Sequence, residues 1–551
     1  DTLSLHDALP ISPPSLALKH VESAIQRLIR STLGLPTPLE PFCLLGRSTA
    51  LVLTGQDLAL ADAGELELVS RGADVLDLRV DTLPAHYGST PSTPLSASPP
   101  FATSSLHPTA RAPSRTNADP FHASLAFGFL RQSSPLPLIW TVRTTAQGGS
   151  YAGPRAAYLE LVGAGLRLWA DFVDVELALE DDEIATLLRR RGPGTRVVLS
   201  WSWTGESPGW DSDEVRGVYD RAARLGADVV RLSMVARSPS DNYKAAELQS
   251  SLANEGGPPL IALNTGHVGR LSVLLNERLS PISHPRLSTT GIDHRELQTG
   301  LRIVGLERER TVWDDGRSTR TSELVRAGVS DLGLSLELAP LPSSPLAALI
   351  VDGSFGGALL SLPITVAGLP RSVSLAPSAA LSGFTDSISP CPPTAHNSRA
   401  TALAATLAAN LSPVNLVGRW SSAVVVDLSG RDARELAWAL GSLGVRKLFA
   451  VRSEGLQGDE REVVPCEDLD EVVRSAGSRG PTIVVCGGEG VELPQGLRES
   501  STGGVVLSLG GNAQRETGGW IGVGRDELEL AAARACFTNL TGKRPPGIST
   551  V

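Results

Sequence analysis

The feature that most constrains the fold is a repeated alternation of short apolar strands and helical stretches in the first half of the chain. Strands are expected at residues 49–54, 73–83, 137–143, 172–177, 195–200, 228–234 and 259–264. A helix is expected at residues 57–71, and further helical stretches lie between the later strands. Short apolar runs bounded by turn residues are typical of buried parallel strands. Because these β/α units repeat over about 240 residues, the pattern predicts an α/β protein with a (β/α)8 barrel.

Composition excludes several classes of function. The 551 residues carry a formal net charge of −10, which argues against a general nucleic-acid or anionic-membrane surface. No apolar run reaches the ~18 residues that a membrane helix needs. The five cysteines are scattered without a zinc-type spacing, so we predict no metal site and a reducing compartment, cytoplasmic and/or nuclear. They are Cys43, Cys391, Cys466, Cys486 and Cys536.

The domain organisation follows from changes in pattern along the chain. Residues 1–12 look like a translated sequencing adapter and are left out of the fold reasoning. Residues 13–47 carry a helical stripe, which is either the remnant of an upstream domain or a linker. The barrel is expected at 48–298, with a disordered Ser/Pro/Thr-rich insertion at 84–120. Two further domains are expected at 299–400 and 401–551, and the second is Rossmann-like in its element order.

Several barrel motifs resemble those of type I 3-dehydroquinate dehydratases. Residues 72–81 resemble a Gly-Ala-Asp…Glu-x-Arg-x-Asp motif, with Asp77 in place of the Glu. Residues 141–149 resemble the Thr-x-Arg…Gly-Gly strand of the same family. The resemblance implies that Asp77, Arg79 and Arg143 contact the ligand. The alternative is that Arg79 and Arg143 are buried strand arginines that pair only with Asp77 and Asp81.

The residues that differ from this family's motifs stand at its catalytic positions. The stretch Gly226-Ala227-Asp228-Val229-Val230-Arg231 matches the strand that carries the family's Schiff-base lysine, and Arg231 stands at the lysine position. A guanidinium stays protonated, so it cannot form an imine with a carbonyl carbon. It pairs well with carboxylates, so Arg231 is expected to join a ligand clamp. Ser202 stands where the family has its general acid/base histidine. We therefore predict no catalytic residues in the barrel.

The second half of the chain resembles shikimate dehydrogenase, with a substrate-binding domain followed by a Rossmann-like domain. Its catalytic Lys and Asp correspond here to Thr365 and Arg399. The glycine-rich cofactor loop keeps only Gly430, and Arg434 matches a conserved position of the family motif. Pyrophosphate needs close backbone approach and free N–H groups at the start of a helix. Asp427 and Asp432 would repel it, so we predict no NADP binding.

A dehydratase followed by a shikimate dehydrogenase is the order found at the C-terminal end of the fungal pentafunctional AROM polypeptide. Loss of both catalytic sets in this order resembles the quinate repressor proteins of filamentous fungi, whose first domain is shikimate kinase-like. On that resemblance residues 13–47 would belong to a missing kinase-like domain. The resemblance implies a pseudoenzyme that represses quinate catabolism genes. Its partners would be the pathway's activator protein and a quinate or shikimate pathway metabolite, with no direct nucleic-acid contact.

Two alternatives remain open at this stage. The first is an active bifunctional enzyme with 3-dehydroquinate dehydratase and NADP-dependent shikimate dehydrogenase activities. The changes at Ser202, Arg231, Thr365 and Arg399 argue against it. The second is a degenerate product that binds no ligand, and the intact apolar strand patterns argue against that.

Overall fold

The computed structural model describes residues 47–60, 62–83, 119–134, 136–192, 194–316, 319–411, 422–456, 461–476, 480–488, 491–499, 503–511 and 520–543. Residues 13–46 of the expected helical segment, which include Cys43, lie outside these ranges. The chain divides into two compact units, Asp1–Gly300 and Leu301–Val551, and each is described by itself. Within the described ranges, no helix is both long and apolar enough to cross a membrane.

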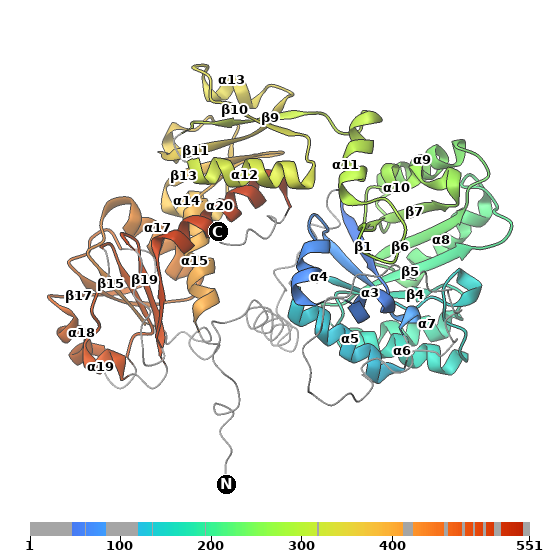
Figure 1. Ribbon diagram of the computed structural model, residues 1–551, viewed down its shortest axis with the longest axis horizontal. Coiled ribbons are helices and arrows are strands. Elements are labelled where there is room, and N and C mark those ends of the chain that lie inside the picture. Colours follow the sequence, from blue (N-terminus) through green and yellow to red (C-terminus); the bar gives the residue numbers. More distant parts are fainter. Residues whose placement is uncertain are drawn as a thin grey trace, which may run out of the picture. The chain divides into compact units, whose positions relative to one another are not determined.

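Unit 1 is built on eight parallel strands in the order β7-β6-β5-β4-β3-β2-β1-β8 (blue to green in Figure 1). Strand β1 is hydrogen-bonded to both β2 and β8, which brings the first and last strands together. This confirms the predicted (β/α)8 barrel. The strands are β1 Thr49–Leu53, β2 Val75–Arg79, β3 Leu138–Thr141, β4 Phe172–Glu176, β5 Arg196–Trp203, β6 Val229–Val235, β7 Leu260–Thr265 and β8 Ser280–Ile282.

The barrel interior changes from apolar to polar along the strands. One cluster of buried side chains takes a member from each of the first seven strands and one from the residue before β8: Ala50, Val75, Ile139, Phe172, Val198, Val229, Ile261 and Leu279. Because side chains alternate faces with a period of two, the residues two and four positions later share the interior face. Those positions carry the polar residues of the candidate site, at the carboxyl ends of the strands.

The helices of unit 1 follow the strands, as expected for β/α units. They are α3 Gly55–Leu60, α4 Ala63–Val69, α5 Pro120–Ser133, α6 Arg155–Arg167, α7 Asp181–Leu188, α8 Asp213–Leu225, α9 Ser240–Asn254, α10 Leu271–Leu275 and α11 His294–Ile303. Short 3-10 turns are η1 Val80–Thr82, η2 Thr145–Gln147 and η3 His267–Gly269.

Three local expectations were wrong. The single helix at 57–71 is two helices, because Asp62 caps the start of α4 by accepting from Glu65 N at 2.7 Å. The strand at 73–83 ends at Arg79, because Thr82 Oγ1 donates to Arg79 O at 2.6 Å and closes a 3-10 turn. The insertion at 84–120 is shorter, since Asp119 caps α5 and Pro120 is its first residue. Residues 84–118 lie outside the described residues.

Unit 2 contains two six-stranded sheets. The mixed sheet has the order β10-β9-β11-β13-β14-β12, and the other is wholly parallel with the order β17-β16-β15-β18-β19-β20. The mixed sheet consists of β9 Arg310–Asp314, β10 Leu336–Pro340, β11 Phe355–Thr365, β12 Ser374–Leu375, β13 Phe384–Pro390 and β14 Pro393–His396. The parallel sheet consists of β15 Ser422–Val426, β16 Lys447–Val451, β17 Glu462–Cys466, β18 Ile483–Cys486, β19 Gly504–Ser508 and β20 Trp520–Val523.

The parallel sheet is buried on both faces, because alternate residues of β15 belong to two different apolar clusters. Its strand order reverses between β15 and β18, which is the arrangement of a doubly wound fold. The helices are α12 Thr319–Leu332, α13 Leu346–Ile350, α14 Pro377–Ser382, α15 Ser398–Asn410, α17 Gly430–Ser442, α18 Leu469–Ala476, α19 Gln495–Arg498 and α20 Arg525–Thr541, with the 3-10 turn η4 Val366–Gly368.

Helix α20 ties the two sheets of unit 2 into one body. Leu528, near its start, belongs to a core of the parallel sheet. Phe537 and Leu540, near its end, belong to the core of the mixed sheet. Figure 1 shows α20 beside α12 and α15, and the inter-helix contacts agree. The two sheets of unit 2 therefore share one packed helix.

Candidate functional site

Arg231 lies in the middle of β6 and points into the barrel, with 7% of its surface exposed. Its Nη1 lies 3.0 Å from Asp174 Oδ2 on β4 and 3.4 Å from Asp77 Oδ2 on β2. A single guanidinium nitrogen therefore bridges two carboxylates from strands on either side of β3. No hydrogen bond to Arg231 Nε or Nη2 occurs among the described residues, so these donors remain available to a ligand.

The two carboxylates are themselves held by hydroxyl donors. Thr141 Oγ1 donates to Asp77 Oδ1 at 2.5 Å, and Ser200 Oγ donates to Asp174 Oδ1. Both aspartates are almost fully buried. Buried carboxylates of this kind are stable only when cations and donors surround them. Arg231 therefore has a structural role in addition to any contact with a ligand.

Arg143 follows β3 at the barrel mouth and is the least engaged of the three cations. Its one described hydrogen bond joins Nη2 to Asp174 Oδ2 at 3.4 Å, near the outer limit for such a bond. Burial is the largest cause of a lowered pKa at Arg143. The Asp174 carboxylate opposes this effect, while the guanidiniums of Arg231 and Arg79 add to it. An incoming carboxylate would offset both the cost of burying this cation and the repulsion from the neighbouring guanidiniums.

Arg79 differs from Arg143 and Arg231 because its hydrogen bonds go to Asp81 and not to Asp174. Its Nε and Nη2 donate to Asp81 Oδ1 and Oδ2 at 2.9 and 2.7 Å, a bidentate pair. Asp81 also accepts from Ser150 N at 2.9 Å, which attaches the loop after β3 to the end of β2. Arg79 therefore pairs with Asp81, and its contact with a ligand stays a prediction. Arg143 pairs instead with Asp174.

Glu176 ends β4 and anchors the loop after β3. Its two carboxylate oxygens accept from Thr144 N at 2.7 Å and Thr144 Oγ1 at 2.9 Å. Burial raises the pKa of Glu176 to about 7, with Asp174 adding to the rise and the Thr144 donors and Arg143 opposing it. Near neutral pH this carboxyl group is therefore only partly charged.

Ser202 lies on the interior face of β5, two residues beyond Ser200. Its Oγ lies 2.7 Å from Ser233 Oγ on β6, and its backbone N donates to Gln147 Oε1 at 2.7 Å. A serine hydroxyl near neutral pH is a poor acid and a poor base, so it does not replace a histidine in proton transfer.

The sequence analysis missed Asp174, Glu176, Ser233 and Gln147. The first two alternate with apolar residues in β4, a pattern that places both carboxylates on one face of a strand. This alternation could have identified both carboxylates from the sequence. No such signal identified Ser233 or Gln147, because their contacts depend on which strands are neighbours in the barrel.

No described lysine replaces the missing Schiff-base amine. The whole sequence contains four lysines: Lys19, Lys244, Lys447 and Lys543. In the described part of unit 1 only Lys244 occurs, on α9 outside the strands. Its Nζ pairs with Asp211 at 2.9 Å, and its side chain is exposed. The barrel interior offers guanidinium and hydroxyl donors, but the described residues offer no amine for an imine.

In unit 2, Arg399 lies in the first turn of α15 and forms a partly buried ion-pair network. It pairs with Asp432 and, at 2.6 Å, with Glu435 Oε2, both on α17. Glu435 is fully buried and also accepts from Arg431 Nε at 2.7 Å and Asn397 Nδ2 at 3.0 Å. Burial alone would lower the pKa of Arg399, but the Glu435 and Asp432 carboxylates raise it.

A cleft of about 480 Å³ is lined by part of this network, Arg399, Arg431 and Asp432. Its wall includes Arg399, Asp386, Arg431 and the segment Arg320–Ser322. Asp386 accepts from the backbone N of Ser398 and Arg399 at 2.8 and 3.0 Å. Thr365 ends β11, and its side chain is exposed. Thus Arg399 lines the cleft while tied to two carboxylates, and its guanidinium stays protonated.

The residues around Gly430 do not fit a pyrophosphate. The turn before α17 begins with Asp427, which is not a glycine yet has a φ of +55°. Its carboxylate pairs with Arg452 at 2.7 Å. The turn therefore already holds a negative charge where a phosphate would approach, paired with a cation of the same chain. The Arg434 guanidinium stacks 4.4 Å from the centre of the Phe384 ring. The absence of a bound cofactor stays a prediction.

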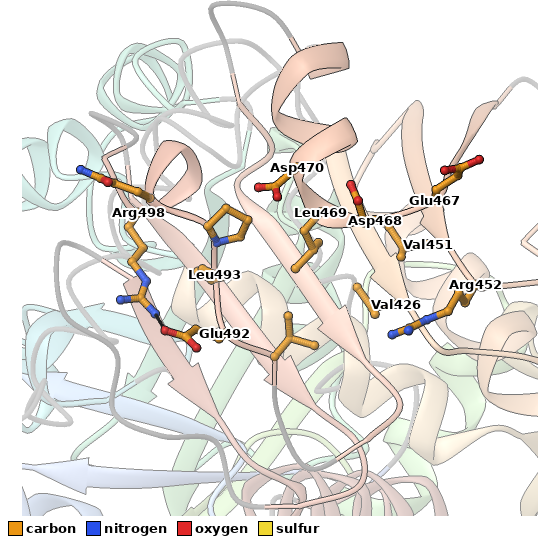
Figure 2. Close-up of a pocket in the computed structure, with 13 residues that line it drawn as sticks. Val426, Val451, Arg452, Glu467, Asp468, Leu469, Asp470, Glu492, Leu493 and Arg498 are labelled. Atoms are coloured by element: carbon orange, nitrogen blue, oxygen red, sulfur yellow. Dashed lines mark hydrogen bonds and ion pairs between the residues drawn. The ribbon is translucent and has the colours of Figure 1, made fainter.

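A second cavity of unit 2, of about 680 Å³, lies at the carboxyl end of the parallel sheet (Figure 2). Its apolar lining includes Val426, Val451, Leu469 and Leu493. Its charged rim residues are Arg452, Glu467, Asp468, Asp470, Glu492 and Arg498. Each rim arginine pairs with a carboxylate, Arg452 with Asp427 and Arg498 with Glu492. The rim therefore has an excess of negative charge and disfavours phosphates. No cluster of metal-type ligands occurs among the described residues.

Comparisons with known proteins agree with this architecture. The family model of type I 3-dehydroquinase matches residues 49–307. The chain is 28% identical over 574 residues to the pentafunctional AROM polypeptide of Malassezia globosa, which covers 95% of this chain and 32% of the relative. It is 26% identical to the AROM polypeptide of Mycosarcoma maydis, covering 69% of this chain and 24% of that one. The chain thus spans a third or less of the length of these relatives.

A solved structure has the same two-part fold. The dehydroquinate dehydratase and shikimate dehydrogenase from S. pombe AroM matches with a TM-score of 0.70 and 22% sequence identity, covering 92% of this chain and 97% of that one. The fold predicted from sequence is thereby confirmed: a type I dehydroquinase-like parallel α/β barrel followed by shikimate dehydrogenase-like domains. The chain resembles the dehydroquinase and shikimate dehydrogenase region of the AROM polypeptide.

Proposed function

We propose that this chain is a catalytically inactive relative of that AROM region, acting as a repressor of quinate catabolism genes. It binds the pathway's activator protein, and a quinate or shikimate pathway metabolite bound at the barrel mouth is its signal. It works in the cytoplasm and/or the nucleus, with no direct nucleic-acid contact. The alternative is a bifunctional enzyme with dehydroquinate dehydratase and NADP-dependent shikimate dehydrogenase activities.

The observation that carries the proposal is Arg231. It stands on β6 where an amine would be needed, it is buried, and it is paired with Asp174 and Asp77. Imine formation requires a neutral primary amine, which a guanidinium does not provide. The same guanidinium keeps two donors free for a carboxylate. The geometry therefore supports reversible binding in place of covalent catalysis.

Unit 2 supports the same conclusion independently. Transfer of a proton to or from a substrate hydroxyl needs a group whose protonation state can change near neutral pH. Arg399 stays charged, and its guanidinium is tied to Glu435 and Asp432. Imine formation at Arg231 in the barrel and proton transfer at Arg399 in unit 2 thus both lack the side chain that they need.

The catalytic part of the proposal is tested with 3-dehydroquinate and borohydride. Intact-protein mass spectrometry should show no adduct after reduction, and a dehydration assay should show no turnover. An active type I dehydroquinase, treated in parallel, supplies the positive control. Turnover by this chain, or a mass increase on the peptide containing Arg231, would establish the enzymatic alternative.

The regulatory part is tested with a reporter gene under a quinate-catabolism promoter, co-expressed with the activator protein. Adding this chain should lower reporter output, and quinate should restore it. Purified chain should also capture the activator without quinate and release it when quinate is added. A reporter unaffected by the chain would refute the repressor role, even if the barrel binds quinate.

A further inference from the structure

The barrel mouth contains a pair of hydroxyls that no described residue fully satisfies. Ser202 Oγ and Ser233 Oγ lie 2.7 Å apart on β5 and β6, at directly paired positions of the two strands. Each residue is 9% exposed. Two hydroxyls carry two protons, and the bond between them uses one. Among the described contacts the second proton has no acceptor, and oxygen lone pairs remain for a donor.

Gln147 contacts this serine pair, and the three uncharged side chains Ser202, Ser233 and Gln147 are together called the neutral wall. It ends the η2 turn after β3 and is 6% exposed. Its Oε1 accepts from Ser202 N at 2.7 Å, which fixes the orientation of the amide because a backbone N–H can only donate. The Nε2 group consequently faces away from Ser202 N, and it makes no hydrogen bond among the described residues. A nearly buried amide donor without a partner indicates a polar group still to be bound.

The neutral wall stands next to the cations. Arg231 and Ser233 are two residues apart on β6, so their side chains share the interior face. Ser200 and Ser202 are paired with them on β5. A ligand whose carboxylate lies on the free donors of Arg231 and Arg143 therefore presents its ring substituents to Ser202, Ser233 and Gln147.

We infer that Ser202, Ser233 and Gln147 form a hydroxyl-reading wall, so that the site prefers a cyclic carboxylate bearing an alcohol over the matching ketone. The inference rests on the proposed function, in which a pathway carboxylate binds at this mouth. An alcohol both donates and accepts, so it closes a hydrogen-bonded array with the serine pair and the Gln147 amide. A ketone only accepts, and it leaves a buried serine lone pair without a donor.

The test compares quinate with 3-dehydroquinate, which differ by an alcohol and a ketone at one ring carbon. Isothermal titration calorimetry on the full chain should show quinate binding about five- to tenfold more tightly, the scale of one net hydrogen bond. In the double variant Ser202→Ala/Ser233→Ala this ratio should fall to about one, while binding of both compounds through the arginines persists. Circular dichroism melting verifies that the variant is folded.

Ser207→Ala is the matched control. Ser207 is a buried serine near the same strand ends, but its Oγ donates to Val235 O at 3.0 Å and has its partner within the chain. Its removal should leave the preference for quinate unchanged.

The outcomes separate the two proposals. Equal affinities for the two compounds, or tighter binding of the ketone, would overturn the hydroxyl-reading wall and leave the receptor proposal standing. A preference that survives in the double variant would overturn it as well. If neither compound binds the wild-type chain, the receptor proposal fails and this inference fails with it.

Discussion

Replacing Arg143 with alanine separates a ligand-binding arginine from a structural one. Its side chain is 16% exposed, and its described hydrogen bond to Asp174 is 3.4 Å long. Losing so long a bond costs the fold about 1 kcal/mol or less. Removing the cation also relieves repulsion from Arg231 and Arg79, the groups that help to lower the pKa of Arg143. We therefore expect a melting temperature within a few degrees of wild type, about 4 °C or less.

The loss in ligand affinity should be much larger. If Arg143 donates to a ligand carboxylate, each charge-assisted hydrogen bond is worth about 1.5–3 kcal/mol. At about 1.4 kcal/mol per factor of ten, Arg143→Ala weakens quinate binding roughly tenfold to hundredfold. Calorimetric titration of the full chain with quinate measures this directly, and Arg143→Lys should recover part of the loss by restoring charge without the planar fork.

Arg131→Ala is the matched control for this experiment. Arg131 on α5 is also buried, with its Nη2 2.6 Å from Asp171 Oδ2 and its guanidinium over the Phe127 ring. Its loss should lower the melting temperature and leave quinate affinity unchanged. The reasoning is refuted if Arg143→Ala behaves like this control, with lower stability and undiminished affinity.

Two further predictions concern buried carboxyl groups. Glu435→Gln leaves the guanidiniums of Arg399 and Arg431 without their shared buried carboxylate, so urea unfolding should show a loss of about 2–4 kcal/mol. Asp432→Asn, at a side chain 43% exposed, should cost less than about 1 kcal/mol; equal losses would contradict the network. For Glu176, a folded-state pKa of about 7 against a usual 4.5 means that the folded protein holds the extra proton between these values. Its contribution to stability is therefore present below pH 4.5 and is lost as pH rises to about 7, on the order of 3 kcal/mol in total. Glu176→Gln should flatten that part of the stability–pH curve, and an unchanged slope would contradict the assignment.

The sequence predicted the barrel well because its signal is local. Apolar strand runs and their spacing fix which residues are buried, and strands β3 to β7 lie within a few residues of their expected positions. The break between α3 and α4 was missed because it depends on one capping side chain, Asp62, in an otherwise helical pattern. The early end of β2 depends similarly on the hydroxyl of Thr82.

Pairings within the site were less accessible to sequence reasoning. Asp77, Arg79, Arg143 and Arg231 were identified individually through motif resemblance. That Asp174 would bridge Arg143 and Arg231 depends on the position of β4 and on the inward direction of its side chains. The same holds for the Ser202–Ser233 pair, which exists because β5 and β6 are neighbours in register. Contacts across strands are properties of the closed barrel.

The pattern of substitutions argues against a chain that is merely decaying. A buried cation without a partner costs several kcal/mol, so random replacement of catalytic residues by arginine would leave a marginal fold. Here Arg231 has Asp174 and Asp77, Arg399 has Glu435 and Asp432, and the turn at Asp427 has Arg452. Each of these three charged positions thus has an opposite charge within ion-pair distance. In the barrel, however, the arginines are not fully paired. Arg143 makes a single long hydrogen bond, and Nε and Nη2 of Arg231 make none among the described residues. Ion pairs that stabilise the fold, together with unsatisfied hydrogen-bond donors at the barrel mouth, are what the proposed non-catalytic receptor for a small carboxylate requires.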